Sequence, residues 1–276
     1  MSYGLTFSEE PADAVERVRR EQLDAAAESL EREEDPVEAI HDARKRIKKT
    51  RALLRLARPG LSRKRYRRRN RALRDTGRAM SGTRDADVLV ETVDDLAERY
   101  AGRQPKTFFT RIRKGLVTET QADPDAHADA LRALAGEPWP LAELAPDDLA
   151  ASLRHTYARG RKAFAKADRE PTTTNLHEWR KRVKDLWYQQ RLLEATWPGV
   201  MKAQAKEAKT LSKLLGEDHD LAVLAQHVDE PELTELIDAR RAELLADARA
   251  LGRRVYAERP KAFARRAGRY VDLTAA

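Results

Sequence analysis

The chain of 276 residues contains no cysteine, which excludes disulfide bonds, thiolate metal sites and thiol-based catalysis. It also has no run of about 18 apolar residues, and its first residues show no basic segment followed by an apolar one. Neither a membrane span nor a secretory signal is therefore expected, and a cytoplasmic location is the default prediction.

Glycine and proline number only 12 each, aromatic residues make up 6%, and no run of alternating β-branched residues occurs. This composition favours an all-α fold. Asp35, Pro36 and Glu38 form a typical helix start, with a capping side chain, a proline in the first turn and a carboxylate three residues after the cap. We predict long helices over 9–33, 36–57, 61–80, 85–101, 147–168, 174–195, 199–215 and 231–257, with a proline-rich seam at 136–146.

The net charge of +8 conceals strongly basic regions. Residues 41–78 include 17 basic and two acidic residues, and residues 177–213 include nine basic and four acidic ones. Because the remaining chain is correspondingly acidic, the positive charge is concentrated in patches, which favours an anionic partner.

A histidine-led basic motif occurs twice, once in each half of the chain. HDARKRIK begins at His41, and HEWRKRVK begins at His177. Helical periodicity places each histidine on the same face as the cations that follow it, beside an apolar stripe. These predicted basic faces comprise His41, Arg44, Lys45, Lys48 and Arg55 in the first copy, and His177, Arg180, Lys181, Lys184 and Arg191 in the second.

A second basic pattern follows each motif, and its two copies have almost the same separation along the chain as the two histidines. It consists of Arg67, Arg71, Arg74 and Arg78 in one copy, and Lys202, Lys206, Lys209 and Lys213 in the other. GTRDADVL (82–89) and GEDHDLAVL (216–224) come next; we predict turns here, with Asp85 and Asp220 capping the following helices. The chain is thus predicted to hold two helical-bundle repeats, 1–140 and 141–276.

The doubled histidine motif, the basic helix and the Gly-x-x-Asp turn resemble the CHAD domain, the conserved histidine α-helical domain, over about residues 9–272. The resemblance implies two four-helix bundles related by a pseudo-twofold repeat, with a basic central groove or channel that binds inorganic polyphosphate. It also implies that the protein is a binding module. Polyphosphate granules are then its candidate location, and the proteins of these granules are candidate partners. The ExExK signature of the companion triphosphate tunnel domain is absent. The second copy departs from the first, with Asp185 and Trp187 in place of Lys49 and Arg51.

Together, the basic faces and stripes form the predicted polyphosphate site, in which arginine forks and lysine point charges contact phosphates. Scarce aromatics disfavour a single-stranded nucleic-acid binder, although RNA or DNA binding stays an alternative. A metal-dependent phosphohydrolase is a weaker one, because dense cations oppose a divalent metal and the His219-Asp220 dipeptide fits a turn. We expect no enzyme activity, catalytic residue, metal or cofactor, and somewhat tighter binding as the pH falls and the histidines gain charge.

Overall fold

The computed structural model describes residues 3–32, 35–80, 85–116 and 124–275, and within these ranges the chain forms helices and no β-strand. The predicted all-α class is confirmed. The α-helices are α1 (Pro11–Arg32), α2 (Pro36–Leu56), α3 (Arg63–Ala79), α4 (Asp85–Arg99), α5 (Lys106–Leu116), α6 (Pro124–Gly136), α7 (Pro146–Arg169), α8 (Thr173–Leu192), α9 (Pro198–Leu224), α10 (Pro231–Val255) and α11 (Pro260–Ala275). Short 3₁₀ turns, η1 (Arg58–Gly60) and η2 (Glu194–Thr196), follow α2 and α8.

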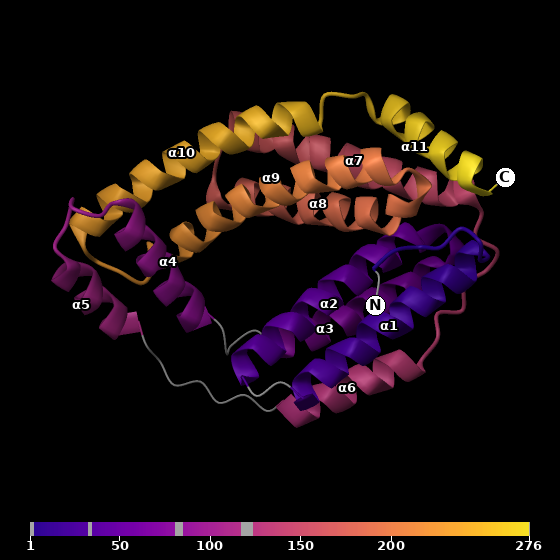
Figure 1. The fold of residues 1–276 in the computed structure, drawn as a ribbon, viewed down its shortest axis with the longest axis horizontal. Coiled ribbons are helices and arrows are strands. Elements are labelled where there is room, and N and C mark those ends of the chain that lie inside the picture. The colour runs from indigo at the N-terminus through magenta and orange to yellow at the C-terminus, as the bar shows by residue number, and fades with distance from the viewer. Residues whose placement is uncertain (1–2, 33–34, 81–84, 117–123, 276) are drawn as a thin grey trace.

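The helices form two main groups (Figure 1). In the first, α1 packs against α2 and α6, and α3 packs against both α2 and α6. In the second, α8 lies between α7 and α9, while α10 covers α9 and α11 covers α7. The two groups meet chiefly where α2 contacts α8.

Helices α4 and α5 pack away from the rest of the first group and contact the second. Leu89, Val93 and Leu96 of α4 share a buried apolar cluster with residues of α5, α9 and α10. Ion pairs from Arg99 to Glu243 and from Arg111 to Glu230 join the same elements. Residues 85–116 therefore have their core in the second group, although they precede residue 140; the internal repeat itself stays a prediction.

Helix α2 shows how the local sequence defines these elements. The Asp35 side chain accepts a hydrogen bond from the Val37 amide, and Pro36 occupies the first turn, as predicted. Its apolar stripe is buried, which orients the basic residues of the same helix outward; the stripe includes Ile40, Ala43, Ile47 and Leu54.

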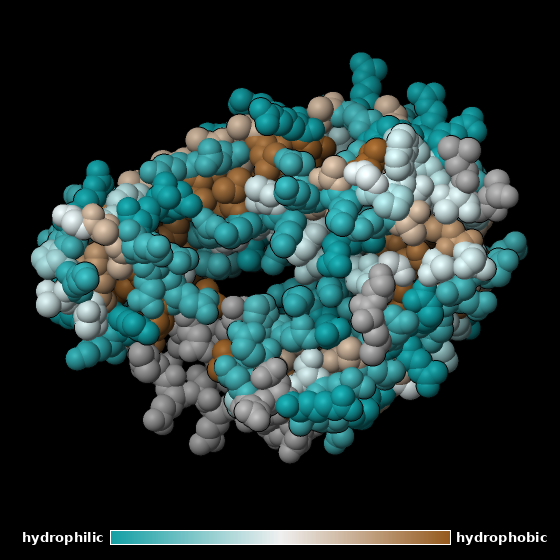
Figure 2. Space-filling view, in the orientation of Figure 1, coloured by the Kyte–Doolittle hydropathy of each residue, from teal (hydrophilic) through white to brown (hydrophobic). Residues whose placement is uncertain are grey.

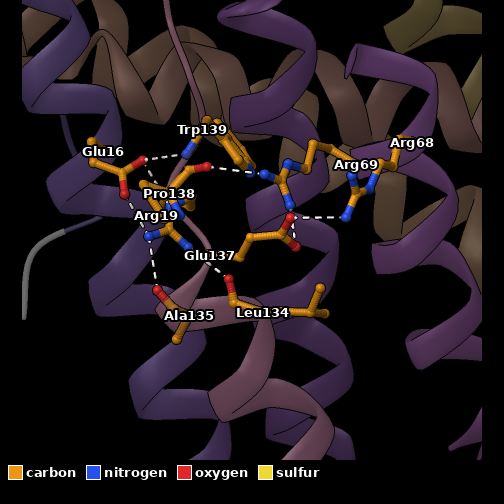
Figure 3. A network of polar contacts seen from close by, with 9 residues as sticks. All are labelled: Glu16, Arg19, Arg68, Arg69, Leu134, Ala135, Glu137, Pro138 and Trp139. Atoms are coloured by element: carbon orange, nitrogen blue, oxygen red, sulfur yellow. Dashed lines mark hydrogen bonds and ion pairs between the residues drawn. The ribbon is translucent and has the colours of Figure 1, made fainter. Parts of the chain in front are cut away.

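The proline-rich segment after α6 is held by arginines of α1 and α3 (Figure 3). The buried Arg19 pairs with Glu16 and donates hydrogen bonds to the carbonyls of Leu134 and Ala135. On α3, Arg68 and Arg69 both pair with Glu137. Part of the charge on α3 thus stabilises the fold.

The predicted turn at 216–224 is wrong, because α9 continues without a break to Leu224. Gly216 lies inside the helix, where a Cβ atom would come 3.3 Å from Arg180 Nη2. The glycine therefore makes room for a neighbouring guanidinium group and does not end the helix, so Asp220 is not a helix cap. The corresponding glycine, at position 82, and the Asp85 side chain lie outside the described residues.

Candidate polyanion-binding site

Helices α2 and α8 carry the two histidine motifs and contact each other near their C-terminal ends. Arg55 of α2 pairs with Asp185 of α8 at 3.2 Å, and Gln189 of α8 donates a hydrogen bond to the Ala52 carbonyl at 3.3 Å. Asp185 also pairs with Arg182 at 3.0 Å. Arg55 was predicted to contact ligand, but one of its interactions is this structural ion pair.

The two histidines differ in their surroundings. The His41 side chain is 36% exposed, with Nδ1 3.8 Å from a Glu38 oxygen. His177 is half-buried and packs against His219 of α9, with ring centroids 4.4 Å apart. Burial first, and then the neighbouring His219 imidazole and the charge of Lys181, lower the pKa of His177 to about 4. His177 is therefore neutral near pH 7, and the expected gain in binding on mild acidification cannot come from it.

Arg44 and Arg180 each reach the helix that follows their own. Arg44 of α2 donates a hydrogen bond to the Met80 carbonyl at 3.2 Å, just after α3. Arg180 of α8 lies against Gly216 of α9. Met80 and Gly216 are as far apart along the chain as the two arginines are, so the two contacts occupy matching positions. Burial lowers the pKa of Arg180, which marks this guanidinium as part of the α8–α9 contact.

The predicted stripes on α3 and α9 lie mostly at the surface. All four lysines of the α9 stripe are exposed, and among the residues that the structure describes, only Lys213 of the four forms an ion pair, with Glu217 at 3.8 Å. On α3, Arg67, Arg71 and Arg78 are exposed, while Arg74 pairs with Asp75 at 2.9 Å. Seven of the eight cations in these two rows are therefore exposed to solvent.

The remaining predicted residues on α2 and α8 are a mixed set. Lys45 and Lys48 are exposed, and Lys45 pairs with Asp42 at 3.1 Å. Lys181 is exposed 3.8 Å from Glu178, and Lys184 is partly exposed.

Arg191 lies in a cluster that the sequence did not indicate. Its guanidinium group is 5.4 Å from the centroid of the Tyr3 ring, and the Lys49 ammonium is 5.2 Å from the same centroid. Burial, followed by the charge of Arg191, lowers the pKa of Lys49 to about 8. The aromatic ring lies close to two like charges and partly offsets their repulsion.

A space-filling view shows an opening through the middle of the molecule (Figure 2). Mostly hydrophilic side chains border it, between the group of α1, α2, α3 and α6 and the group of α7, α8, α9 and α10 (Figures 1 and 2). The predicted basic helices α2, α3, α8 and α9 belong to the two groups on either side.

A cavity of about 810 Å³ lies between the α2–η1–α3 corner and the α7–α8 pair. Only two of its arginines were predicted as site residues. The others on α7 and around η1 lie outside the repeated motifs, so no spacing in the sequence connects them. The lining arginines are Arg55, Arg58, Arg63, Arg67, Arg154, Arg159 and Arg182.

His219 is also a residue of interest that the sequence did not reveal. It was predicted to lie in a turn, and the structure places it on α9 against His177. Within the ranges that the structure describes, no group of three or more histidine or acidic residues is placed to hold a metal ion. No helix in the same ranges is long and apolar enough to span a membrane.

Fold and surface together define an all-helical module with cations concentrated on neighbouring helices. The model of the CHAD domain family matches residues 17–229, so the chain belongs to the CHAD family, which is associated with polyphosphate binding. Among solved structures, the chain is similar to the CHAD domain from the plant Ricinus communis, with a TM-score of 0.57, 18% sequence identity and 94% coverage of each chain. No curated protein matches the chain.

Proposed function

We propose that this protein binds inorganic polyphosphate noncovalently, in the basic groove between its two helical groups, and that it acts as a binding module without enzyme activity. The supporting observation is the pair of accessible cation rows on α3 and α9, each next to a histidine-bearing helix. Polyphosphate carries charge at every unit and has no base to stack, so many cations and few aromatic platforms suit it.

The predicted residues take different roles in this proposal. The exposed rows on α3 and α9, with His41, Lys45, Lys48, Lys181 and Lys184, contact phosphates directly. Arg44 and Arg180 act as positioning residues, since each lies against the helix that follows its own. Arg55 and Arg191 are held by Asp185 and Tyr3 and support the ends of the groove.

Such binding would determine where the protein is located in the cell. A protein with this groove is proposed to be retained at polyphosphate granules in the cytoplasm, where granule proteins become its neighbours. A fluorescent fusion carrying charge reversals in the α9 row would lose this localisation if the groove is responsible.

Calorimetric titration with long-chain polyphosphate at about physiological salt tests the proposal, because this ionic strength suppresses diffuse attraction between charges. The titration is repeated in excess RNA. We expect binding that persists in RNA, and a loss of binding when Arg71→Glu is combined with Lys206→Glu, one residue from each row. Full displacement by RNA would instead support a nucleic-acid binder.

A matched variant distinguishes binding at a defined site from general attraction to positive charge on the protein. Arg253→Glu with Arg254→Glu makes the same change in charge on exposed positions of α10, outside both rows. This control should bind like the unmodified protein; equal losses in the two variants would contradict a defined groove.

A further inference from the structure

The arginine-rich cavity beside η1 holds far more positive than negative charge. Among its described lining residues, the single carboxylate is Asp185, which Arg55 and Arg182 share at 3.2 Å and 3.0 Å. The Arg58 guanidinium lies 5.5 Å from the centroid of the Tyr66 ring. The network around Asp185 therefore satisfies two of the seven lining arginines.

Five arginines of the cavity form no ion pair with any carboxylate that the structure describes, namely Arg58, which lies against the Tyr66 ring, and four others. Arg63 and Arg67 come from α3, and Arg154 and Arg159 come from α7, on the opposite wall. All four are exposed, so their guanidinium groups are accessible to a ligand. Two walls of unpaired arginine thus face one space, an arrangement that suits a ligand bearing several anionic groups.

Titratable groups in the cavity respond to this excess charge. Burial, and then Arg159, Arg58 and Arg154, lower the pKa of His155. Partial desolvation, and then the charge of Arg182, lower the pKa of Arg159, although its side chain stays exposed. The cations therefore disfavour one another's charged state, and an anion bound among them would relieve that repulsion.

A second cavity provides an internal comparison. When the two histidine motifs are aligned, Arg55 and Arg58 correspond to Arg191 and Glu194, which line a cavity of about 640 Å³. The N-terminal residues 3–8 form part of that cavity, and its cations Arg17 and Arg191 are accompanied by Glu21 and Glu194. Since basic and acidic residues are balanced there, the excess of arginine beside η1 is not repeated at the corresponding place in the second half of the chain.

We propose that the cavity beside η1 binds the triphosphate group of a compact ligand. The guanidinium groups on the two facing walls, from Arg63, Arg67, Arg154 and Arg159, balance the roughly four negative charges of a terminal triphosphate in forked hydrogen bonds. The volume of about 810 Å³ falls in the range of small-molecule sites. Pro59, Leu61 and Tyr66 add an apolar wall, against which a nucleoside attached to the triphosphate could pack.

This site is distinct from the histidine end of the groove. His41 and Arg55 lie about four turns apart on α2, a distance of about 21 Å along the helix axis. Arg67 belongs both to the α3 row and to this cavity, whereas Arg154 and Arg159 belong to neither cation row, so substitutions on α7 test the cavity separately from the rows.

Titration of the full chain with inorganic tripolyphosphate, ATP and orthophosphate at physiological salt tests this inference. Arg154→Glu with Arg159→Glu should weaken tripolyphosphate binding by about tenfold or more, because two charge-assisted contacts become repulsive. Arg161→Glu with Lys162→Glu is the matched control; both residues are exposed on α7 and neither lines the cavity. Circular dichroism of each variant verifies the helical fold.

The ligands distinguish two sources of the triphosphate. ATP binding at least as tightly as tripolyphosphate would assign a nucleotide to the cavity, and tripolyphosphate binding alone would assign a short inorganic chain. No binding of either ligand at physiological salt, or equal losses in the two α7 variants, would overturn the proposal. Binding of long-chain polyphosphate is measured in parallel with Arg71→Glu and Lys206→Glu, so that failure of the groove and failure of the cavity are separate results.

Discussion

Replacing the four lysines of the α9 row with alanine should change how binding depends on salt. Lys202, Lys206, Lys209 and Lys213 extend over about three turns, or about 16 Å of helix. All four are exposed and alanine favours helix, so the variant should fold normally. If each lysine neutralises one phosphate, the slope of log affinity against log salt becomes shallower by about 2.8, taking about 0.7 per contact on a flexible single chain.

The assay is fluorescence anisotropy with labelled long-chain polyphosphate between about 50 and 200 mM salt. Over this fourfold range, the affinity of the unmodified protein should fall about 50-fold more than that of the variant. The control replaces four exposed cations outside the rows, namely Arg161, Lys162, Arg253 and Arg254, with alanine. A slope that decreases equally in both variants would refute the assignment of phosphate contacts to the α9 row.

Two further predictions concern the fold around the site. Gly160→Ala places a methyl group 2.4 Å from Oη of the buried Tyr256, so we expect urea denaturation to show a free energy of unfolding lower by about 2 kcal/mol. Gly115→Ala has no neighbouring atom within 4 Å and should cost nothing; a similar loss there would contradict the steric explanation. Burial is the main cause that lowers the pKa values of His177 and His219 to about 4, whereas a histidine in the unfolded chain has a pKa of about 6.5. Protonation of these two side chains therefore favours the unfolded chain. We expect the stability of the protein to decline as the pH falls from about 6.5 to 4. Replacing both histidines with glutamine should flatten the profile of Tm against pH in that window. An unchanged slope would show that these two histidines do not cause the loss of stability at low pH.

The helices and their outward basic faces could be predicted because both depend on local patterns. Asp35 and Pro36 define the start of α2, and apolar periodicity orients its cations, whatever the tertiary packing. Gly216 was misread for the opposite reason. Its role depends on Arg180, which comes from another helix, and no signal near position 216 reveals that neighbour.

The candidate site was predictable only in part. Residues in the two rows recur at a fixed offset, which the sequence shows directly, and they lie at the surface. The cavity beside η1 is assembled from α3 and α7, whose arginines are far apart in the sequence and have no common spacing. Asp185 illustrates the same limit, since its departure from the motif gains meaning only through contact with Arg55.

The packing of α2 against α8 affects how the protein binds a polymer. Because one buried apolar cluster includes residues of α1, α2, α3 and α6 together with residues of α7, α8 and α9, the two sides of the opening are joined through a common core. The spacing between the cation rows is then established during folding, before any ligand arrives. A flexible polyanion loses conformational entropy when it enters the groove, whereas the protein, which is already ordered, loses little.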